Sequence, residues 1–243
     1  HFTANVGKAF RAPSTIESFG SSRQGAGFNV PNPDLKSEEG VTYEVGTRLR
    51  LPIVHANVTA FRSDYTNFVI RQPITFQGLP SFQNQNAGGA RMQGVEVDAT
   101  WAITAGWEVL TNAAYLYGTD TGTGRPLSYV PPFNGLLGAR YTLPEKGAYV
   151  EGVTKWSLRK DQIDSALERE TAGYVVLNLY AGIDLWNVSS GLPDMRLRLA
   201  LENILNQAFR QPTTVEDIRF LGGNANPLVE PSRAFSIALT SRF

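Results

Sequence analysis

Residues 234–243 read Ala-Phe-Ser-Ile-Ala-Leu-Thr-Ser-Arg-Phe and decide the fold class of this chain. Within them Phe235, Ile237 and Leu239 alternate with small or polar residues, and Phe243 ends the chain. An extended strand with this period of two carries bulky apolar side chains on one face and small or polar ones on the other. One face for lipid, one for water and an aromatic residue at the boundary are typical of a transmembrane antiparallel β-barrel.

The same alternation recurs upstream, with turn residues between its occurrences. The further segments lie at 2–10, 41–51, 54–70, 93–101, 107–117, 137–143, 148–158, 175–185 and 195–202. In the segment 54–70 the phase is unclear, because Ala56 and Val58 lie on one face while Phe61 and Tyr65 lie on the other. With the last segment, the sequence predicts an all-β chain of about ten strands.

The connections between these strands alternate in length. Short ones lie near 52–54, 102–106, 144–147 and 187–194, and long ones at about 11–40, 71–90, 118–134, 159–172 and 208–232. Outer-membrane barrels have short periplasmic turns and long external loops, whereas a soluble β-sandwich has no reason to lengthen every second connection. Loops this long are typical of barrels of about 22 strands, so residues 1–243 are expected to be the C-terminal part of such a barrel domain.

Composition limits the other classes. With 42% hydrophobic residues the chain has no run of roughly 20 apolar residues, which excludes a helical membrane protein. Its net charge of +0 argues against a nucleic-acid partner. The chain starts at His1 without an initiator Met or an export signal, so we expect a fragment or a mature piece.

Catalytic and metal chemistry have few candidate residues. The chain has no cysteine and two histidines, His1 and His55, and His55 is expected at a turn. Carboxylates on the predicted inner faces could suggest a glycosidase or a metal site: Glu44, Glu96, Asp98, Asp184 and Glu202. They are explained more simply if they pair with Arg48, Arg50, Arg140, Arg196 and Arg198 across a wet interior. We therefore expect no enzyme, no bound metal and no cofactor.

An ordered series of motifs resembles the barrels of TonB-dependent outer-membrane receptors. It begins with Phe10-Arg11-Ala12-Pro13-Ser14, continues with Asn32-Pro33-Asp34-Leu35-Lys36 followed by Glu38, and then Tyr43-Glu44-Val45-Gly46. Later landmarks are Asp64-Tyr65-Thr66-Asn67-Phe68, Gly94-Val95-Glu96-Val97, Val130-Pro131-Pro132-Phe133 and Leu201-Glu202-Asn203-Ile204-Leu205-Asn206, with the terminal Phe243. The resemblance spans essentially the whole chain.

These motifs also have plain structural interpretations. Pro13 directs the first strand into its loop, and Asn32-Pro33-Asp34 is turn chemistry. Gly94 is expected to relieve crowding where Glu96 and Asp98 face the lumen, and Glu202-Asn203 to mark a bulge. We therefore expect structural roles for the motif residues Phe10, Arg11, Pro13, Asn32, Pro33, Leu35, Glu44, Gly94, Glu96 and Asn203.

The resemblance implies active import across the outer membrane of a Gram-negative bacterium, in a multi-pass barrel surrounded by lipid. Receptors of this family hold a ferric siderophore, haem or cobalamin between an N-terminal plug and the outer loops, and the TonB complex acts on the plug. Neither the plug nor the TonB-binding segment is in this sequence. The resemblance also implies that Phe243 belongs to the signal read by the barrel-assembly machinery.

Ligand identity is less determined. Haem receptors of the family usually place a histidine in the loop between the paired motifs, and residues 15–31 contain none. A bulky anionic ferric siderophore suits aromatic and arginine residues on the predicted outer loops: Phe19, Arg23, Phe28, Phe76, Phe82, Tyr129, Arg159, Arg210, Arg219 and Phe220. A haem or cobalamin receptor, a passive porin with a charged open lumen, and a soluble β-rich binding module are the alternatives.

Overall fold

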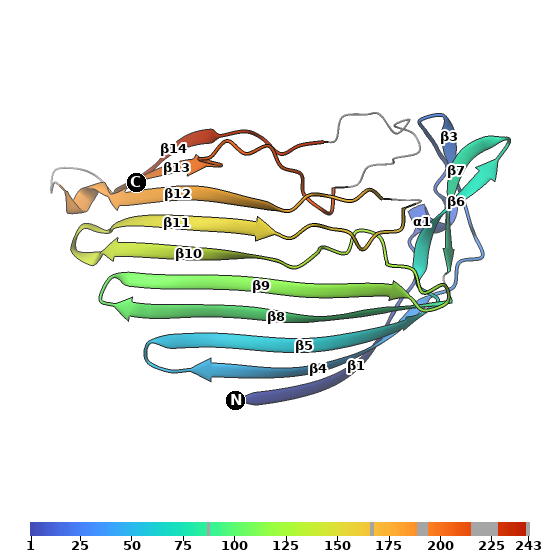
Figure 1. Cartoon of the computed structure of the whole chain (residues 1–243), viewed down its shortest axis with the longest axis horizontal. Helices are drawn as coiled ribbons and strands as arrows, with labels where there is room; N and C mark the ends of the chain where they lie inside the picture. The colour runs from blue at the N-terminus through green and yellow to red at the C-terminus, as the bar shows by residue number, and fades with distance from the viewer. Residues whose placement is uncertain (87, 166–167, 189–193, 215–227, 242–243) are drawn as a thin grey trace.

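The computed structural model describes residues 1–86, 88–165, 168–188, 194–214 and 228–241, and these are nearly all β (Figure 1). Ten strands form one antiparallel sheet in the order β1-β4-β5-β8-β9-β10-β11-β12-β13-β14. Their bounds are β1 Phe2–Arg11, β4 Glu38–Arg50, β5 Val54–Thr66, β8 Gly89–Thr104, β9 Trp107–Asp120, β10 Asn134–Leu143, β11 Ala148–Ser157, β12 Tyr174–Asp184, β13 Met195–Glu202 and β14 Ala234–Ser241. The ten strands predicted from the alternation are confirmed.

Helices are short. The α-helix α1 covers Thr15–Phe19, and the 3₁₀ turns η1 and η2 cover Pro144–Lys146 and Leu185–Asn187. Among the described residues, no helix has the length and apolar character needed to cross a membrane.

The strand register places most of the bulky apolar residues of the ten strands on a single face. Leu179 lies opposite Leu201, Leu199 opposite Ile237, and Leu197 opposite Leu239. At the other end of the sheet, Val45 and Val95 both lie opposite Ala60. We call this the outer face, and many of its large side chains are exposed, including Phe2, Val58, Leu137 and Phe235.

Aromatic residues mark both ends of the outer face. At the end with short turns, the rings of Trp107 and Tyr141 lie 5.0 Å apart. At the opposite end, Phe133 contacts Trp156 at 4.7 Å and Tyr115 at 6.4 Å between ring centroids. Trp107 and Tyr115 are separated along β9 by roughly 26 Å, which matches the height of the apolar band of an outer-membrane barrel.

The two ends of the sheet differ as the connection lengths predicted. The start of β1 and the end of β14 lie toward the short turns, while the long connections gather at the other end (Figure 1). There the loops build a second sheet in the order β2-β3-β7-β6, from Ser22–Gln24, Gly27–Val30, Leu79–Asn86 and Val69–Phe76. The sequence predicted plain loops here, because the parallel pairing of β3 with β7 joins residues more than 50 positions apart.

Some local expectations were wrong. The segment 54–70 is not one strand, since β5 ends at Thr66 and Asn67, with φ of 54°, turns the chain into β6. His55 lies within β5 and not at a turn. Asn203 does not mark a bulge, because β13 ends at Glu202 and Asn203 adopts a left-handed conformation, with φ of 50°, just beyond it. Phe243 lies outside the described residues.

The buried residues lie on the inner face and beneath the loops. Phe82, Ala90 and Leu127 are buried near the loop end, and Val153 and Val176 are buried on the inner face of β11 and β12. A side chain at Gly94 would have its Cβ 2.5 Å from the Tyr115 carbonyl oxygen and 3.0 Å from Phe61 Cε1, so the close neighbours of this glycine lie on β9 and β5.

Candidate functional site

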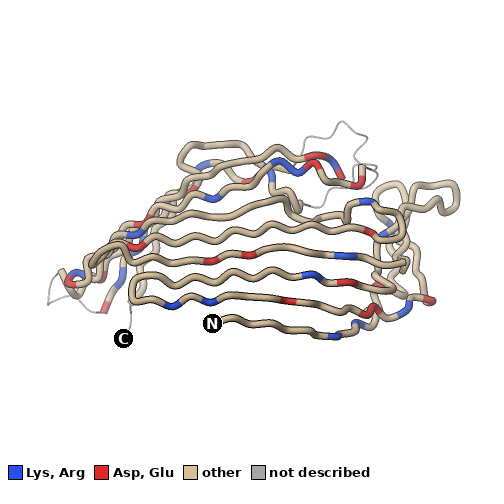
Figure 2. Tube along the Cα trace, turned by 60° about the horizontal axis from the view of Figure 1, so that its bottom comes forward, with Lys and Arg blue, Asp and Glu red and all other residues tan. Residues whose placement is uncertain are grey.

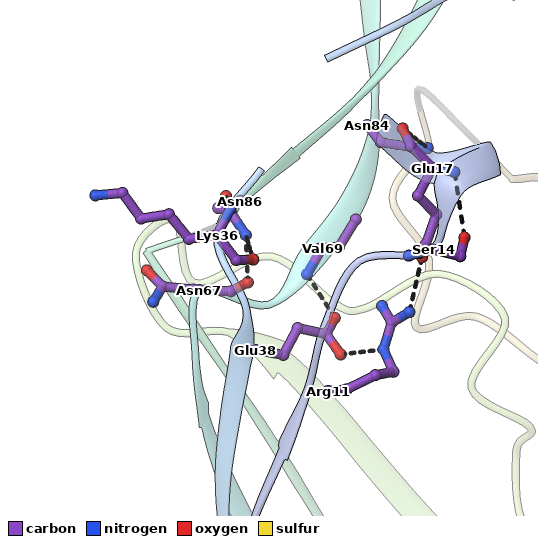
Figure 3. A network of polar contacts seen from close by, with 9 residues as sticks. All are labelled: Arg11, Ser14, Glu17, Lys36, Glu38, Asn67, Val69, Asn84 and Asn86. Carbon is purple, nitrogen blue, oxygen red and sulfur yellow. Dashed lines mark hydrogen bonds and ion pairs between the residues drawn. The ribbon is translucent and has the colours of Figure 1, made fainter. Parts of the chain in front are cut away.

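The junction between the barrel strands and the loop sheet is built around Arg11 at the end of β1 (Figure 3). Arg11 Nε donates to Glu38 Oε2 at 2.6 Å, which joins the first motif to the residue that follows the second. The other carboxylate oxygen of Glu38 accepts from the backbone N–H of Val69 at 2.7 Å, at the start of β6. Glu38 is buried, so this carboxylate fixes three segments in one place.

Arg11 also holds α1 in position. Its Nη1 donates to both carboxylate oxygens of Glu17, at 3.0 and 2.8 Å. Glu17 and Ser14 form a capping box, in which each side chain accepts from the backbone N–H of the other. The Arg11 hydrogen bonds are the main reason why the pKa of Glu17 falls to about 2, because they stabilise its charged form.

Asparagine side chains attach the second motif to the loop sheet. Asn32 Nδ2 donates to the Asn84 carbonyl at 2.9 Å, and Asn84 Nδ2 donates to the Glu17 carbonyl at 3.2 Å. Asn86 accepts from the Lys36 N–H at 2.8 Å and donates back to the Lys36 carbonyl at 3.0 Å. The paired motifs thus meet through β7, which supports the structural roles expected for Arg11 and Asn32.

A pocket of about 320 Å³ opens beside this junction, between β6, β7 and the connection from β9 to β10. Its walls include Arg71, Phe82, Arg125 and Tyr129, together with Met92 of β8 and Asp164. Arg71 lies over the Phe82 ring, with Cζ 3.9 Å from the ring centroid. Arg125 Nη1 lies 3.8 Å from Asp164 Oδ2, and Asp120 also lines the pocket, so two guanidinium groups share it with two carboxylates. The aromatic rings and the N–H donors of the arginines suit a ligand with flat rings and acceptor oxygens.

The floor of this pocket is formed by a loop folded against the inner face. A Cβ at Gly118 of β9 would lie 2.8 Å from Val130 Cγ2 and 3.1 Å from Leu127 Cβ. Because Gly118 has no side chain, the connection 121–133 can approach the strand closely. The pocket therefore lies on the inner side of the sheet at its loop end.

A buried ion pair links three of the loops. Lys160 Nζ donates to Glu168 Oε1 at 2.6 Å, and both side chains are almost completely buried. The same oxygen of Glu168 accepts from the Tyr129 N–H at 2.8 Å, and Lys160 also donates to the Pro212 carbonyl at 3.4 Å. Tyr129 is thus held in the pocket wall by its backbone.

The ten predicted ligand residues do not form one cluster. Phe82 and Tyr129 line the pocket, whereas Phe28 and Phe76 contact each other at 5.9 Å in the loop sheet. Phe19 is exposed at the end of α1, and Arg23 is exposed in β2.

Two of the remaining predicted residues are arginines with protein partners, and the other two lie outside the described residues. Arg159 pairs with Glu170, and Arg210 donates to Thr171 Oγ1 at 3.2 Å and to the Thr214 carbonyl at 3.1 Å. Arg219 and Phe220 lie outside the described residues. Arg71 and Arg125 were not predicted, although both are arginines at or within long connections, the signal that selected the others.

Inside the barrel wall the predicted carboxylate–arginine pairs are only partly present. Asp184 binds Arg196 directly. Arg48 reaches Asp98 only through Asn57, with hydrogen bonds of 2.9 and 2.8 Å. Two further predicted inner carboxylates use other donors, since Glu44 accepts from the Asn5 amide and Glu202 from the Tyr180 hydroxyl.

No group of three or more metal-ligating side chains occurs in the part of the chain that the structure describes. The carboxylates of the inner wall bind polar groups of neighbouring strands. The pocket, in contrast, brings together arginines and aromatic rings.

Comparison with known proteins decides the family. The profile described as "TonB dependent receptor-like, beta-barrel" matches residues 1–204. The chain belongs to the TonB-dependent receptor β-barrel family. Its fold matches the solved structure of the copper transporter OprC with a TM-score of 0.83 and 20% identity, over 98% of this chain and 36% of that one.

Curated relatives of this receptor barrel are receptors and transporters, not enzymes. Hemoglobin-haptoglobin utilization protein B of Neisseria meningitidis is 19% identical over 294 residues, covering 100% of this chain and 35% of the relative. The ferric enterobactin receptor PirA of Pseudomonas aeruginosa is 24% identical over 264 residues, covering 99% of this chain and 34% of the relative. The chain thus spans about a third of the length of these relatives.

Proposed function

We propose that residues 1–243 form the C-terminal part of the barrel of an outer-membrane receptor that imports a ferric siderophore with energy supplied through TonB. The observation that carries this proposal is the pocket at the loop end, where Arg71 lies over Phe82 and Tyr129 and Arg125 complete the wall. Its place on the inner side of the sheet is where a ligand entering from outside the cell would first be held.

The size of the pocket is consistent with a partial site. At about 320 Å³ it lies at the lower end of the roughly 300–1,000 Å³ range of small-molecule sites. We infer that it takes one aromatic or acidic arm of a bulky chelate. The remainder of the ligand would lie against other loops and a plug domain. The ferric enterobactin receptor PirA among the relatives supports this ligand class.

Haem uptake is the second candidate, because a relative is named for haemoglobin-haptoglobin utilisation. The histidines of this chain argue against it. His1 and His55 are the only two, and His55 lies near the short-turn end of β5, far along the strand from the pocket. A haem iron held at the loops would need an axial ligand other than a histidine from this chain.

Whole-cell uptake in a strain lacking other receptors would test the proposal, with the full-length receptor and labelled ferric siderophores, haem and cobalamin as substrates. We expect uptake of at least one ferric siderophore, dependent on TonB, and about tenfold weaker binding by the Arg71→Gln/Arg125→Gln variant. An Arg50→Gln variant at the short-turn end is the matched control.

Two outcomes would contradict the proposal. Uptake of haem or cobalamin alone would assign a different ligand. Uptake that continues without TonB, together with open-channel conductance in a planar bilayer, would identify a passive porin.

A further inference from the structure

Charged residues on the outer face of the ten-stranded sheet are confined to one place. The register assigns five charged residues to this face: Lys8, Glu39, Arg62, Asp64 and Arg91. All of them lie on β1, β4, β5 and β8 near the strand ends that lead into the long connections. Figure 2 shows all charged positions of the described chain, on both faces. The remainder of the outer face of the described strands is apolar, small or uncharged.

These charges lie just beyond the aromatic residues at the loop end of the outer face, Tyr115, Phe133 and Trp156. Val95 lies opposite both Ala60 and Tyr115, so these three residues form one row across the sheet. Arg62 is two positions past Ala60 toward the loops, which is roughly 7 Å along the strand. This is the level at which lipid headgroups follow the aromatic girdle of an outer-membrane barrel.

The cations are arranged around one carboxylate. Arg62 Nε donates to Asp64 Oδ2 at 2.8 Å, and Arg91 Nε donates to Asp64 Oδ1 at 2.7 Å. Each guanidinium carries five N–H donors in a fixed fork, so binding Asp64 orients both groups and leaves terminal N–H donors for a further acceptor. About half of the Arg62 side chain is exposed, and 41% of Arg91.

Lys8 extends the cluster toward β1. Val41 lies opposite both Lys8 and Asp64, which places Lys8 two strand spacings, or roughly 10 Å, from Asp64. Lys8 pairs with Glu39 at 2.9 Å and is 68% exposed. Three cations against two carboxylates leave an excess of positive charge on a face that is otherwise built for lipid.

We propose that Lys8, Arg62 and Arg91 form a binding site for the phosphate groups of a phosphorylated glycolipid of the outer leaflet, the lipid A type. A free phosphate ion does not explain the placement, because the site lies on the outer face next to exposed apolar residues that acyl chains can cover. Tyr43, which lies opposite both Val6 and Arg62, supplies such a surface at its lower border. The inference rests on the outer-membrane location proposed above, and not on the identity of the imported ligand.

Native mass spectrometry of the full-length receptor in detergent, titrated with bisphosphorylated lipid A, tests the site. We expect Arg62→Gln or Arg91→Gln to weaken binding about fivefold each and the double variant about 25-fold. Arg198→Gln, on the inner face of β13, is the matched control and should leave the affinity unchanged. If the double variant does not fold, Lys8→Gln tests the site instead. The Lys8 side chain is exposed, so this substitution should not disturb the sheet.

Further arms separate the possible ligands. Dephosphorylated lipid A should bind at least about tenfold more weakly, and inorganic phosphate should not compete at millimolar concentration. Equal binding of lipid A by the double variant and the wild type would overturn the proposal. Equal sensitivity to the variants with phosphatidylglycerol would overturn it in favour of a general anionic surface. Cell fractionation is run first. If the receptor is absent from the outer membrane, that result contradicts the proposed location and not the proposed lipid site.

Discussion

Arg11 and Glu38 are separated by 27 positions in the sequence and meet through a 2.6 Å hydrogen bond between Nε and Oε2. The bond joins the ends of β1 and β4, at the point where the first long connection leaves the sheet and returns to it. Glu38 also accepts from Val69, so one buried carboxylate ties the first and second long connections to the same strand end.

This pair should be energetically coupled. Arg11→Gln and Glu38→Gln should each destabilise the junction, and the double variant by less than their sum, with a coupling of about 1–3 kcal/mol. Hydrogen exchange at the Val69 amide gives a local measurement, because that amide donates to Glu38. Arg50→Gln serves as the control at the opposite end of β4. Fully additive effects on Val69 exchange would contradict the coupling.

The capping box should be stable to acid until low pH. Because the pKa of Glu17 is lowered to about 2 in the folded chain, its contribution is fully present above the ordinary value of 4.5 and is lost as the pH falls through 2. Hydrogen exchange across residues 14–20 of the full-length receptor should therefore stay protected from pH 8 to 5 and rise between about pH 4 and 2. Glu17→Gln should be poorly protected at every pH. Loss of protection already at pH 6 in the unmodified receptor would contradict this assignment.

A charged residue on the outer face should lower the stability of the receptor in lipid. Arginine at Leu137, Leu179, Leu199 or Leu239 should destabilise the full-length receptor in lipid vesicles by about 2–4 kcal/mol when the site lies near the bilayer midplane. Urea unfolding measures this difference. Ala200→Arg on the inner face is the control.

Asn178, on the same inner face, is a poor control for that experiment, because it is buried and its Oδ1 accepts from the Asn203 N–H at 2.8 Å. Arginine there would break this contact. If lipid-soluble spin labels contacted position 200 and not position 199, the assignment of faces would be wrong.

The first two long connections should act as one specificity unit. Because β3 of the first connection pairs with β7 of the second, swapping only one of the regions 11–40 and 71–90 into a related barrel should disrupt the loop sheet. Swapping both together with 208–232 should transfer ligand preference in whole-cell uptake. Replacing the 144–147 turn should leave preference unchanged, since η1 lies at the opposite end of the sheet. Unchanged preference after the triple swap would defeat the prediction.

Isolated residues 1–243 should assemble poorly. β1 and β14 are the two edges of the ten-stranded sheet. Unpaired backbone groups cost several kcal/mol each in lipid, so the fragment expressed alone in detergent should aggregate, as size-exclusion chromatography would show. A monodisperse, heat-modifiable monomer would indicate a small closed barrel instead.

The sequence alone determined the strands, the faces of all of them except the segment 54–70, and the two ends of the sheet, because the period of two is a local property of each segment. Leu199 and Leu239 could be placed on one face without knowing that their strands are neighbours. The same local signal failed at Asn67, where apolar residues continue on both sides of a turn formed by a left-handed backbone.

Only the tertiary structure decided which distant segments meet at the loop end. The pairing of β3 with β7, the bond from Arg11 to Glu38 and the stacking of Arg71 on Phe82 join residues whose local sequence carries no periodic signal for each other. The grouping of Lys8, Arg62 and Arg91 likewise required the strand register, since each looks in sequence like an isolated polar residue near a strand end. Such contacts depend on closing long loops and on matching donors to acceptors across strands, and both are properties of the folded chain as a whole.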